Sequence, residues 1–79
     1  MSSQNKITIR RNMRFAKALA KILKEQGLQQ VDIIKGSNGR ISFGVLWHWL
    51  QGRNCPSRAH EEVLCEVLGV TSKDLSLGS

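Results

Sequence analysis

Apolar residues recur along most of the chain at the three- and four-residue intervals that are typical of amphipathic helices. The longest such stretch follows Asn12, a suitable helix N-cap, and stops at Gly27, since glycine commonly terminates helices. Its apolar positions are Met13, Phe15, Ala18, Leu19, Ile22 and Leu23. The pattern therefore predicts a first helix over residues 13–26 with one apolar face.

Two short helices with a turn between them come next. Residues 28–35 predict the first of these helices, and Ser42 can cap the second, which runs to about Gln51. The sequence Gly36-Ser37-Asn38-Gly39 is typical of a turn, because both glycines can adopt positive φ. Helix, turn and helix together have the size of a helix-turn-helix unit.

The last part of the chain predicts a fourth helix and a final turn. The fourth helix is expected over residues 58–68, with Ser57 as its N-cap. Its apolar stripe consists of Val63, Leu64, Val67 and Leu68. Thr71 and Asp74 have the spacing of a capping box, so we expect a last helical turn over residues 74–77. The sequence thus predicts an all-α fold, a small bundle of about five short helices.

Residues 1–12 allow two interpretations. The segment Lys6-Ile7-Thr8-Ile9-Arg10 alternates polar and apolar residues, which favours either a short strand or a flexible basic arm. A strand would pair within the protein or with a second copy, whereas an arm would reach around a partner. We therefore expect an N-terminal arm or strand over residues 1–12 and one helix-turn-helix domain over residues 13–77.

The charge of the chain points to a polyanionic partner. The 79 residues include 12 Lys+Arg and 6 Asp+Glu, a net charge of 12 − 6 = +6. Residues 1–40 carry nine basic and two acidic side chains, a balance of +7, and residues 41–79 carry three and four, a balance of −1. Such one-sided basic charge is typical of nucleic-acid-binding proteins. Two cysteines exclude a disulfide-dense scaffold, and no apolar run approaches the ~18 residues of a membrane span.

Three short motifs carry a resemblance to a known family. They are Gly27-Leu28-x-Gln30, Trp49-x-x-Gly52-x-x-x-Pro56-Ser57, and Leu64-x-x-x-Leu68-Gly69-Val70-Thr71 followed by Asp74-Leu75. With the first helix included, residues 13–77 resemble the Cro and lambda-repressor class of helix-turn-helix domains from phages and bacteria. The resemblance implies a dimeric transcription regulator that binds palindromic operators. The chain is longer than this family between Gln30 and Trp49, so we expect a lengthened turn over residues 36–40.

The third helix departs from the residues that the family usually places there. Between Phe43 and Gln51 there is no Arg, Lys or Asn for a bidentate base contact. Trp47 and Trp49 are about 200° apart on a helix of about 100° per residue, so both cannot face the core. The resemblance implies that the inward residues are Leu46, Trp49 and Leu50. Hydrophobic grouping alone predicts a different inward set, namely Phe43, Leu46, Trp47 and Leu50.

The candidate DNA-binding residues come from three regions. Gln30 matches the family position that contacts phosphate, and Arg53 and Asn54 lie where the family often contacts the backbone again. The candidates on the third helix are Phe43, Gly44, Trp47, His48 and Gln51. The basic residues expected to reach phosphates or a groove are Lys6, Arg10, Arg11 and Arg40. For His48, Arg53 and Asn54, a solvated surface without a function is an equally good interpretation.

Metal binding and catalysis find little support in the sequence. The two histidines and two cysteines, His48, Cys55, His60 and Cys65, lack the Cys-x-x-Cys spacing of compact zinc modules. No phosphate-binding loop, nucleophile elbow or His-Glu-x-x-His motif occurs. We therefore predict no metal, no cofactor and no enzymatic activity.

These features together predict a sequence-specific regulator that binds double-stranded DNA, as a homodimer that acts as a repressor in the bacterial cytoplasm or nucleoid. The third helix would enter the major groove while the basic N-terminal half contacts phosphates. Candidate dimer surfaces are the exposed end of the fourth helix and the Leu75/Leu77 tail. Two alternatives stay open: a protein-interaction module on the same scaffold, such as an antitoxin or a phage- or plasmid-encoded modulator of a host protein, and an architectural protein that reads DNA shape. No membrane partner is expected.

Overall fold

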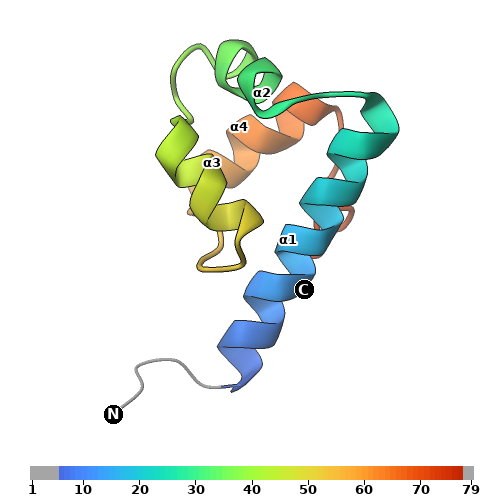
Figure 1. Ribbon diagram of the computed structural model, residues 1–79, viewed down its shortest axis with the longest axis vertical. Coiled ribbons are helices and arrows are strands. Elements are labelled where there is room, and N and C mark those ends of the chain that lie inside the picture. Colours follow the sequence, from blue (N-terminus) through green and yellow to red (C-terminus); the bar gives the residue numbers. More distant parts are fainter. Residues whose placement is uncertain (1–5, 78–79) are drawn as a thin grey trace.

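The computed structural model describes residues 6–77, with side chains from Ile9 onward, and within that range the fold is all-helical (Figure 1). Its four helices are α1 (Lys6–Gln26), α2 (Gln30–Gly36), α3 (Phe43–Leu50) and α4 (Arg58–Leu68). Figure 1 shows the first turns of α1 extending beyond the other three helices, which pack together beside its C-terminal part. The predicted all-α bundle is confirmed, with four helices in the described range rather than about five.

The structure corrects the prediction of a strand or a flexible arm in the N-terminal segment. Residues 6–12 are helical and continuous with the rest of α1, so they form neither a strand nor a flexible arm; residues 1–5 lie outside the described range. β-branched residues in this segment lower helix stability by only a few tenths of a kcal/mol each. Extending a helix that is already nucleated adds one hydrogen bond per residue, whereas an isolated strand has no partner to bond with. The expected division between residues 12 and 13 therefore falls inside one helix.

The core is built around the buried face of α1. Phe15 and Leu19 on this face are fully buried, and they pack with Leu46 and Trp49 of α3 and with Leu64 of α4. The Trp49 ring meets the Phe15 ring edge-on, with centroids 6.0 Å apart. The same indole meets His60 of α4 edge-on at 5.6 Å. Trp49 thus joins three of the four helices.

The two predicted serine caps are confirmed. Ser42 Oγ accepts a hydrogen bond from Val45 N at 3.2 Å at the start of α3. Ser57 Oγ accepts one from His60 N at 3.4 Å at the start of α4. Each cap satisfies a backbone donor that the first helical turn leaves without a partner, so each fixes where its helix begins.

The connection between α2 and α3 occupies residues 37–42 and is stabilised by the hydrogen bonds of a buried serine. Ser37 is buried; its hydroxyl donates to Ile34 O at 2.9 Å and accepts from Ile41 N at 3.1 Å. The expected turn geometry is only partly right, because the positive φ values belong to Asn38 and Gly39. Gly36 is instead the last residue of α2, and a Cβ there would lie 3.0 Å from a methyl carbon of Val67 on α4.

The C-terminal segment forms a turn rather than a fifth helix. The predicted capping pair is present, because Asp74 Oδ2 accepts from Thr71 N at 3.0 Å and Thr71 Oγ1 accepts from Asp74 N at 3.3 Å. The hydrogen bonds that Thr71 N and Thr71 Oγ1 donate to Asp74 Oδ2 lower the pKa of the Asp74 carboxyl. Ser76 then adopts a φ of 59°, which ends the helical path after one turn. Leu75 is fully buried in the core, so it is not a dimer surface.

α3 adopts one of the two predicted registers. Leu46 and Trp49 are buried, whereas Phe43, Gly44, Trp47 and His48 are exposed. The inward set that was inferred from the resemblance is therefore observed. The set from hydrophobic grouping is wrong, because placing Trp47 in the core would turn Trp49 about 200° away from Phe15 and His60.

Replacing Leu75 with Ala tests whether the C-terminal turn belongs to the core. We expect the free energy of unfolding to fall by about 2–5 kcal/mol, because the substitution leaves a cavity beneath α1 and α4. Urea unfolding followed by circular dichroism measures this change. The control is Lys73→Ala, an exposed position in the same turn, which is expected to change stability by less than about 0.5 kcal/mol. Equal stability of the two variants would contradict the assignment of Leu75 to the core.

Candidate nucleic-acid interface

The outer face of α3 is the most distinctive surface of the molecule. It consists of Phe43, Gly44, Trp47 and His48. The Phe43 side chain is 52% exposed and the Trp47 side chain 43% exposed, although both are large and apolar. These two residues are four positions apart and lie on one ridge of the helix, and Gly44 and His48 form the neighbouring ridge. The face therefore offers aromatic surface and one imidazole, with no cationic side chain of its own.

A cation is nevertheless held against this face. The Arg53 guanidinium carbon lies 5.2 Å from the centroid of the Trp47 ring, within the range of a cation–π interaction. His48 meets the same ring edge-on at 5.1 Å. Trp47, His48 and Arg53, all predicted as site residues, are thus brought together. Gln51 and Asn54 are also exposed, at the end of α3 and in the loop that follows it.

The loop that carries Arg53 is fixed to α1 by Asn12. This asparagine was expected to cap the first helix, but it lies inside α1 and is 4% exposed. Its Nδ2 donates to Arg53 O at 3.1 Å, and its Oδ1 accepts from Cys55 Sγ at 3.1 Å. Burial raises the pKa of the Cys55 thiol, with a smaller opposing effect of Arg11, so the thiol keeps the proton that it donates to Asn12. The amide therefore sets the position of the backbone from which the Arg53 side chain reaches Trp47.

A cationic groove on α1 adjoins this loop. The groove is lined by Ile9, Arg10, Met13, Arg14 and Lys17, and the Met13 side chain also packs against Gly52. Arg10 was predicted as a site residue, whereas Arg14 and Lys17 were not. The signal for them is the spacing 10, 14, 17, which places them on one helical face once α1 is known to begin at Lys6.

Two predicted site residues lie elsewhere. Arg11 lines a separate hollow that also contains Glu61 and Glu62 of α4. Arg40 lines another hollow, together with Glu66 of α4. Each cation therefore has carboxylates on its side of the molecule, and neither shares the groove of Arg10 or the outer face of α3. Arg10 and Arg11 therefore line different hollows, because adjacent residues on a helix point about 100° apart.

The start of α2 is less favourable to phosphate than the sequence indicated. Gln30 is the first residue of α2 and is exposed, as expected. However, the Asp32 carboxylate accepts a hydrogen bond from Gln29 N at 2.7 Å and so occupies one of the free backbone donors. A negative charge there opposes a phosphate. The Lys6 side chain, another predicted site residue, lies outside the described side chains.

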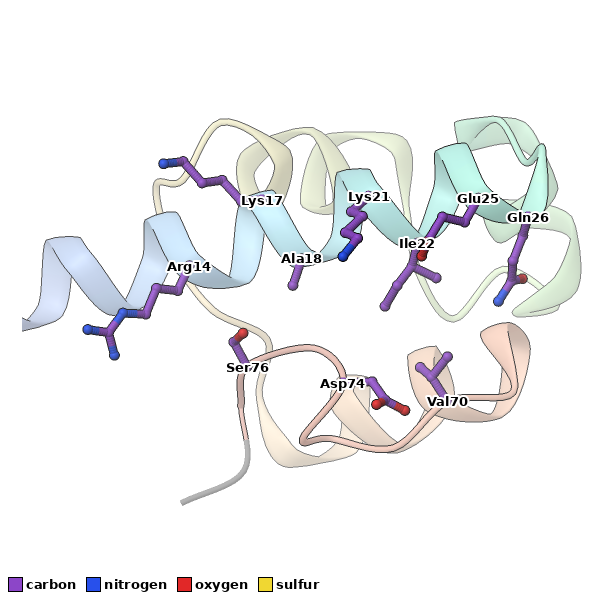
Figure 2. Close-up of a pocket in the computed structure, with 10 residues that line it drawn as sticks. All are labelled: Arg14, Lys17, Ala18, Lys21, Ile22, Glu25, Gln26, Val70, Asp74 and Ser76. Carbon is purple, nitrogen blue, oxygen red and sulfur yellow. The ribbon is translucent and has the colours of Figure 1, made fainter.

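A larger groove lies next to the cationic groove on α1 and shares Arg14 and Lys17 with it (Figure 2). It has a volume of about 570 Å³ and is bounded by α1 and the C-terminal turn. Figure 2 shows Ala18, Ile22 and Val70 between basic and acidic side chains, which include Lys21, Glu25 and Asp74. At one end, Gln26 Nε2 donates to Leu68 O at 2.8 Å. Because its charges are mixed, the groove indicates no ligand of a single sign.

Other chemistry is sparse in the described part of the chain. No group of three or more His, Cys, Asp or Glu side chains there could hold a metal ion. His60 packs on Trp49, and Cys55 and Cys65 are free thiols that contact Asn12 and Ser72 respectively. Among residues 6–77, no helix is both long enough and apolar enough to cross a membrane.

Comparison with known proteins gives no further guide, since no family model, no curated protein and no solved structure matches this chain. The case for a function therefore depends on the geometry of α3, the Arg53 loop and the cationic groove.

Replacing Asn12 with Ala tests the connection between α1 and the Arg53 loop. We expect the free energy of unfolding to fall by about 1–3 kcal/mol, because a partly buried carbonyl and a partly buried thiol are each left without a partner. Thermal or urea unfolding provides the measurement. The matched control is Asn54→Ala, which removes an exposed amide from the same loop and is expected to have little effect. A neutral Asn12→Ala variant would show that the amide does not hold this loop.

Proposed function

We propose that this protein binds double-stranded DNA and regulates transcription as a dimeric repressor in the bacterial cytoplasm or nucleoid. In this proposal α3 enters the major groove with its outer face toward the bases. The cationic groove and Arg53 contact the phosphates on the same side. The role needs no catalytic step, metal or cofactor.

The observation that carries the proposal is that cationic side chains lie beside the exposed face of α3. The Arg53 guanidinium rests on Trp47, and Met13 joins the cationic groove to Gly52 in the same loop. The acidic side chains of α4 line other hollows. Arg53 and the cationic groove therefore provide positive charge beside α3 to which a phosphate backbone could bind, while Glu25 and Asp74 line the adjoining groove that shares Arg14 and Lys17. The resemblance to Cro and lambda-repressor domains agrees with this orientation of α3.

The dimer belongs to the proposal because a single α3 reads only a short half-site. Two copies related by a twofold axis would place two α3 helices about 34 Å apart, one turn of DNA. The exposed part of α4 and the partly exposed Leu77 are the remaining candidates for the contact between copies, since Leu75 is buried.

A protein-binding role is the second candidate. The observation that favours it is the exposure of Phe43 and Trp47, because aromatic side chains dominate the centres of protein interfaces. An antitoxin would combine both roles. An architectural role keeps the DNA binding of the first proposal but not its sequence specificity, because the protein would then recognise the shape of the DNA.

Selection of bound duplexes from a random DNA library tests the proposal. We expect enrichment of a palindrome whose half-sites are spaced by about one helical turn, with binding that weakens steeply as salt rises. Salt-dependent binding without an enriched sequence would favour the architectural role. Failure to bind any duplex at low salt would refute DNA binding and favour the protein partner.

A charge-matched pair of triple variants locates the phosphate contacts. Replacing Arg10, Arg14 and Lys17 with Ala is expected to make the slope of log K against log salt shallower by about 0.9 for each phosphate that the variant no longer neutralises. The control replaces Arg40, Arg58 and Lys73 with Ala, which removes the same charge from surfaces away from the cationic groove. We expect the control to keep the original slope. Equal changes in both variants would mean that net charge, rather than this groove, drives binding.

A further inference from the structure

Gly44 has no structural reason to be glycine. Its φ is not in the left-handed region, and a Cβ built on it would meet nothing within 4 Å. It lies in the first turn of α3, where glycine is less stable than alanine. The fold is therefore slightly weakened by a residue that no internal contact requires, and the remaining reason for a missing side chain is close approach of something outside the chain.

The surroundings of Gly44 define what can approach. Phe43 and Trp47 form an apolar ridge along one side of it, and His48 continues its own ridge. The missing side chain at Gly44 thus leaves open space next to exposed aromatic surface, which is called the notch below. A notch of this kind suits a small apolar group such as a methyl, and α3 presents no carboxylate, amide or guanidinium that would select a polar base edge.

The nearby charges indicate which class of molecule carries that methyl group. Arg53 is held on the Trp47 ring, and the cationic groove of Arg10, Arg14 and Lys17 adjoins the same loop. A second copy of this chain would bring two sets of these cations together, which disfavours it as the occupant. A polyanion that also displays methyl groups meets both conditions, and in the major groove of DNA the thymine C5-methyl is such a group.

We propose that α3 reads thymine methyl groups, with Gly44 as the point of closest approach and with Phe43 and Trp47 as the apolar walls around the methyl. This inference rests on the proposed DNA-binding function and specifies its substrate as duplex DNA with thymine in each half-site. Sequence discrimination then comes from apolar contact rather than from bidentate hydrogen bonds.

Deoxyuridine provides a direct test, because it pairs as thymidine does but lacks the methyl group. The probe is the duplex enriched by selection, compared with the same duplex in which single thymines are replaced by deoxyuridine. We expect affinity to fall about fourfold for each contacted methyl, the value of burying one such group. The ratio of the affinities for the two duplexes is expected to stay constant as the salt concentration rises, because the phosphate contacts are the same in both.

Variants of the α3 face test whether the ratio of affinities for the thymine and deoxyuridine duplexes depends on the notch at Gly44. Trp47→Ala and Phe43→Ala are expected to bring the thymine-to-deoxyuridine ratio close to one, whereas Trp47→Phe keeps part of it. The control is Val31→Ala, which removes an apolar side chain that is 37% exposed from α2, away from the cationic groove. It is expected to leave the ratio unchanged.

Gly44→Ala separates a structural from a functional role for the glycine. We expect the Tm to rise by about 2–4 °C, because alanine stabilises the helix and meets no neighbour. Affinity for the selected duplex is expected to fall on the order of tenfold, because the new methyl fills the notch. A Gly44→Ala variant that binds as tightly as the original chain would overturn the proposal.

The outcomes distinguish this inference from the function on which it rests. A selected duplex without thymine in its half-sites, or with equal affinity after replacement by deoxyuridine, overturns thymine reading and leaves DNA binding intact. Absence of binding to any duplex overturns both proposals. An equal fall of the ratio in Val31→Ala would also overturn the assignment to α3.

Discussion

The burial of Trp49 is the constraint on which the arrangement of this small protein depends. Its indole meets Phe15 of α1 and His60 of α4, so one side chain of α3 fixes the helix against two others. On a helix with about 100° per residue, a buried Trp49 obliges Trp47 to point outward. The same rotation exposes Phe43, Gly44 and His48. The apolar outer face of α3 is thus a geometric consequence of the core, and it lowers the solubility of the protein unless a partner covers it.

Fixing the loop after α3 is the second requirement of the site. Asn12 holds the segment that follows α3 against α1, and Met13 packs on Gly52 of the same segment. The two hydrogen bonds of the Asn12 amide hold Arg53 O and Cys55 Sγ, and they leave the Arg53 side chain free to lie on Trp47. A cation that is positioned in advance loses less conformational entropy when it meets a phosphate than a freely moving one.

Much of the fold could be predicted from the sequence because its signals are local. Serine caps at Ser42 and Ser57, and the capping pair of Thr71 and Asp74, act within three residues and were read correctly. The start of α1 was predicted wrongly. The segment from Lys6 to Arg10 alternates polar and apolar residues as a strand does, although forming a helix there costs little free energy. The role of Asn12 was also missed, since its partners lie 41 and 43 residues away and only tertiary packing brings them together. The charge balance over residues 1–40 was correct but did not separate Arg10 from Arg11, because that separation depends on where the helix begins.

The extension of α1 changes how affinity and specificity are divided in the proposed complex. A flexible arm would have placed its arginines wherever the nucleic acid lay, and could have compensated for a third helix without hydrogen-bonding side chains. A rigid helix holds Arg10, Arg14 and Lys17 on one line, so they can follow a phosphate backbone but cannot enter a distant groove. Phosphate contacts fix the register of a protein on DNA and carry no sequence information. Whatever discrimination the protein achieves through direct contact therefore falls to the outer face of α3. Because that face is apolar around a glycine, its selectivity in the proposed complex would depend on the shape of the groove and on the methyl groups within it.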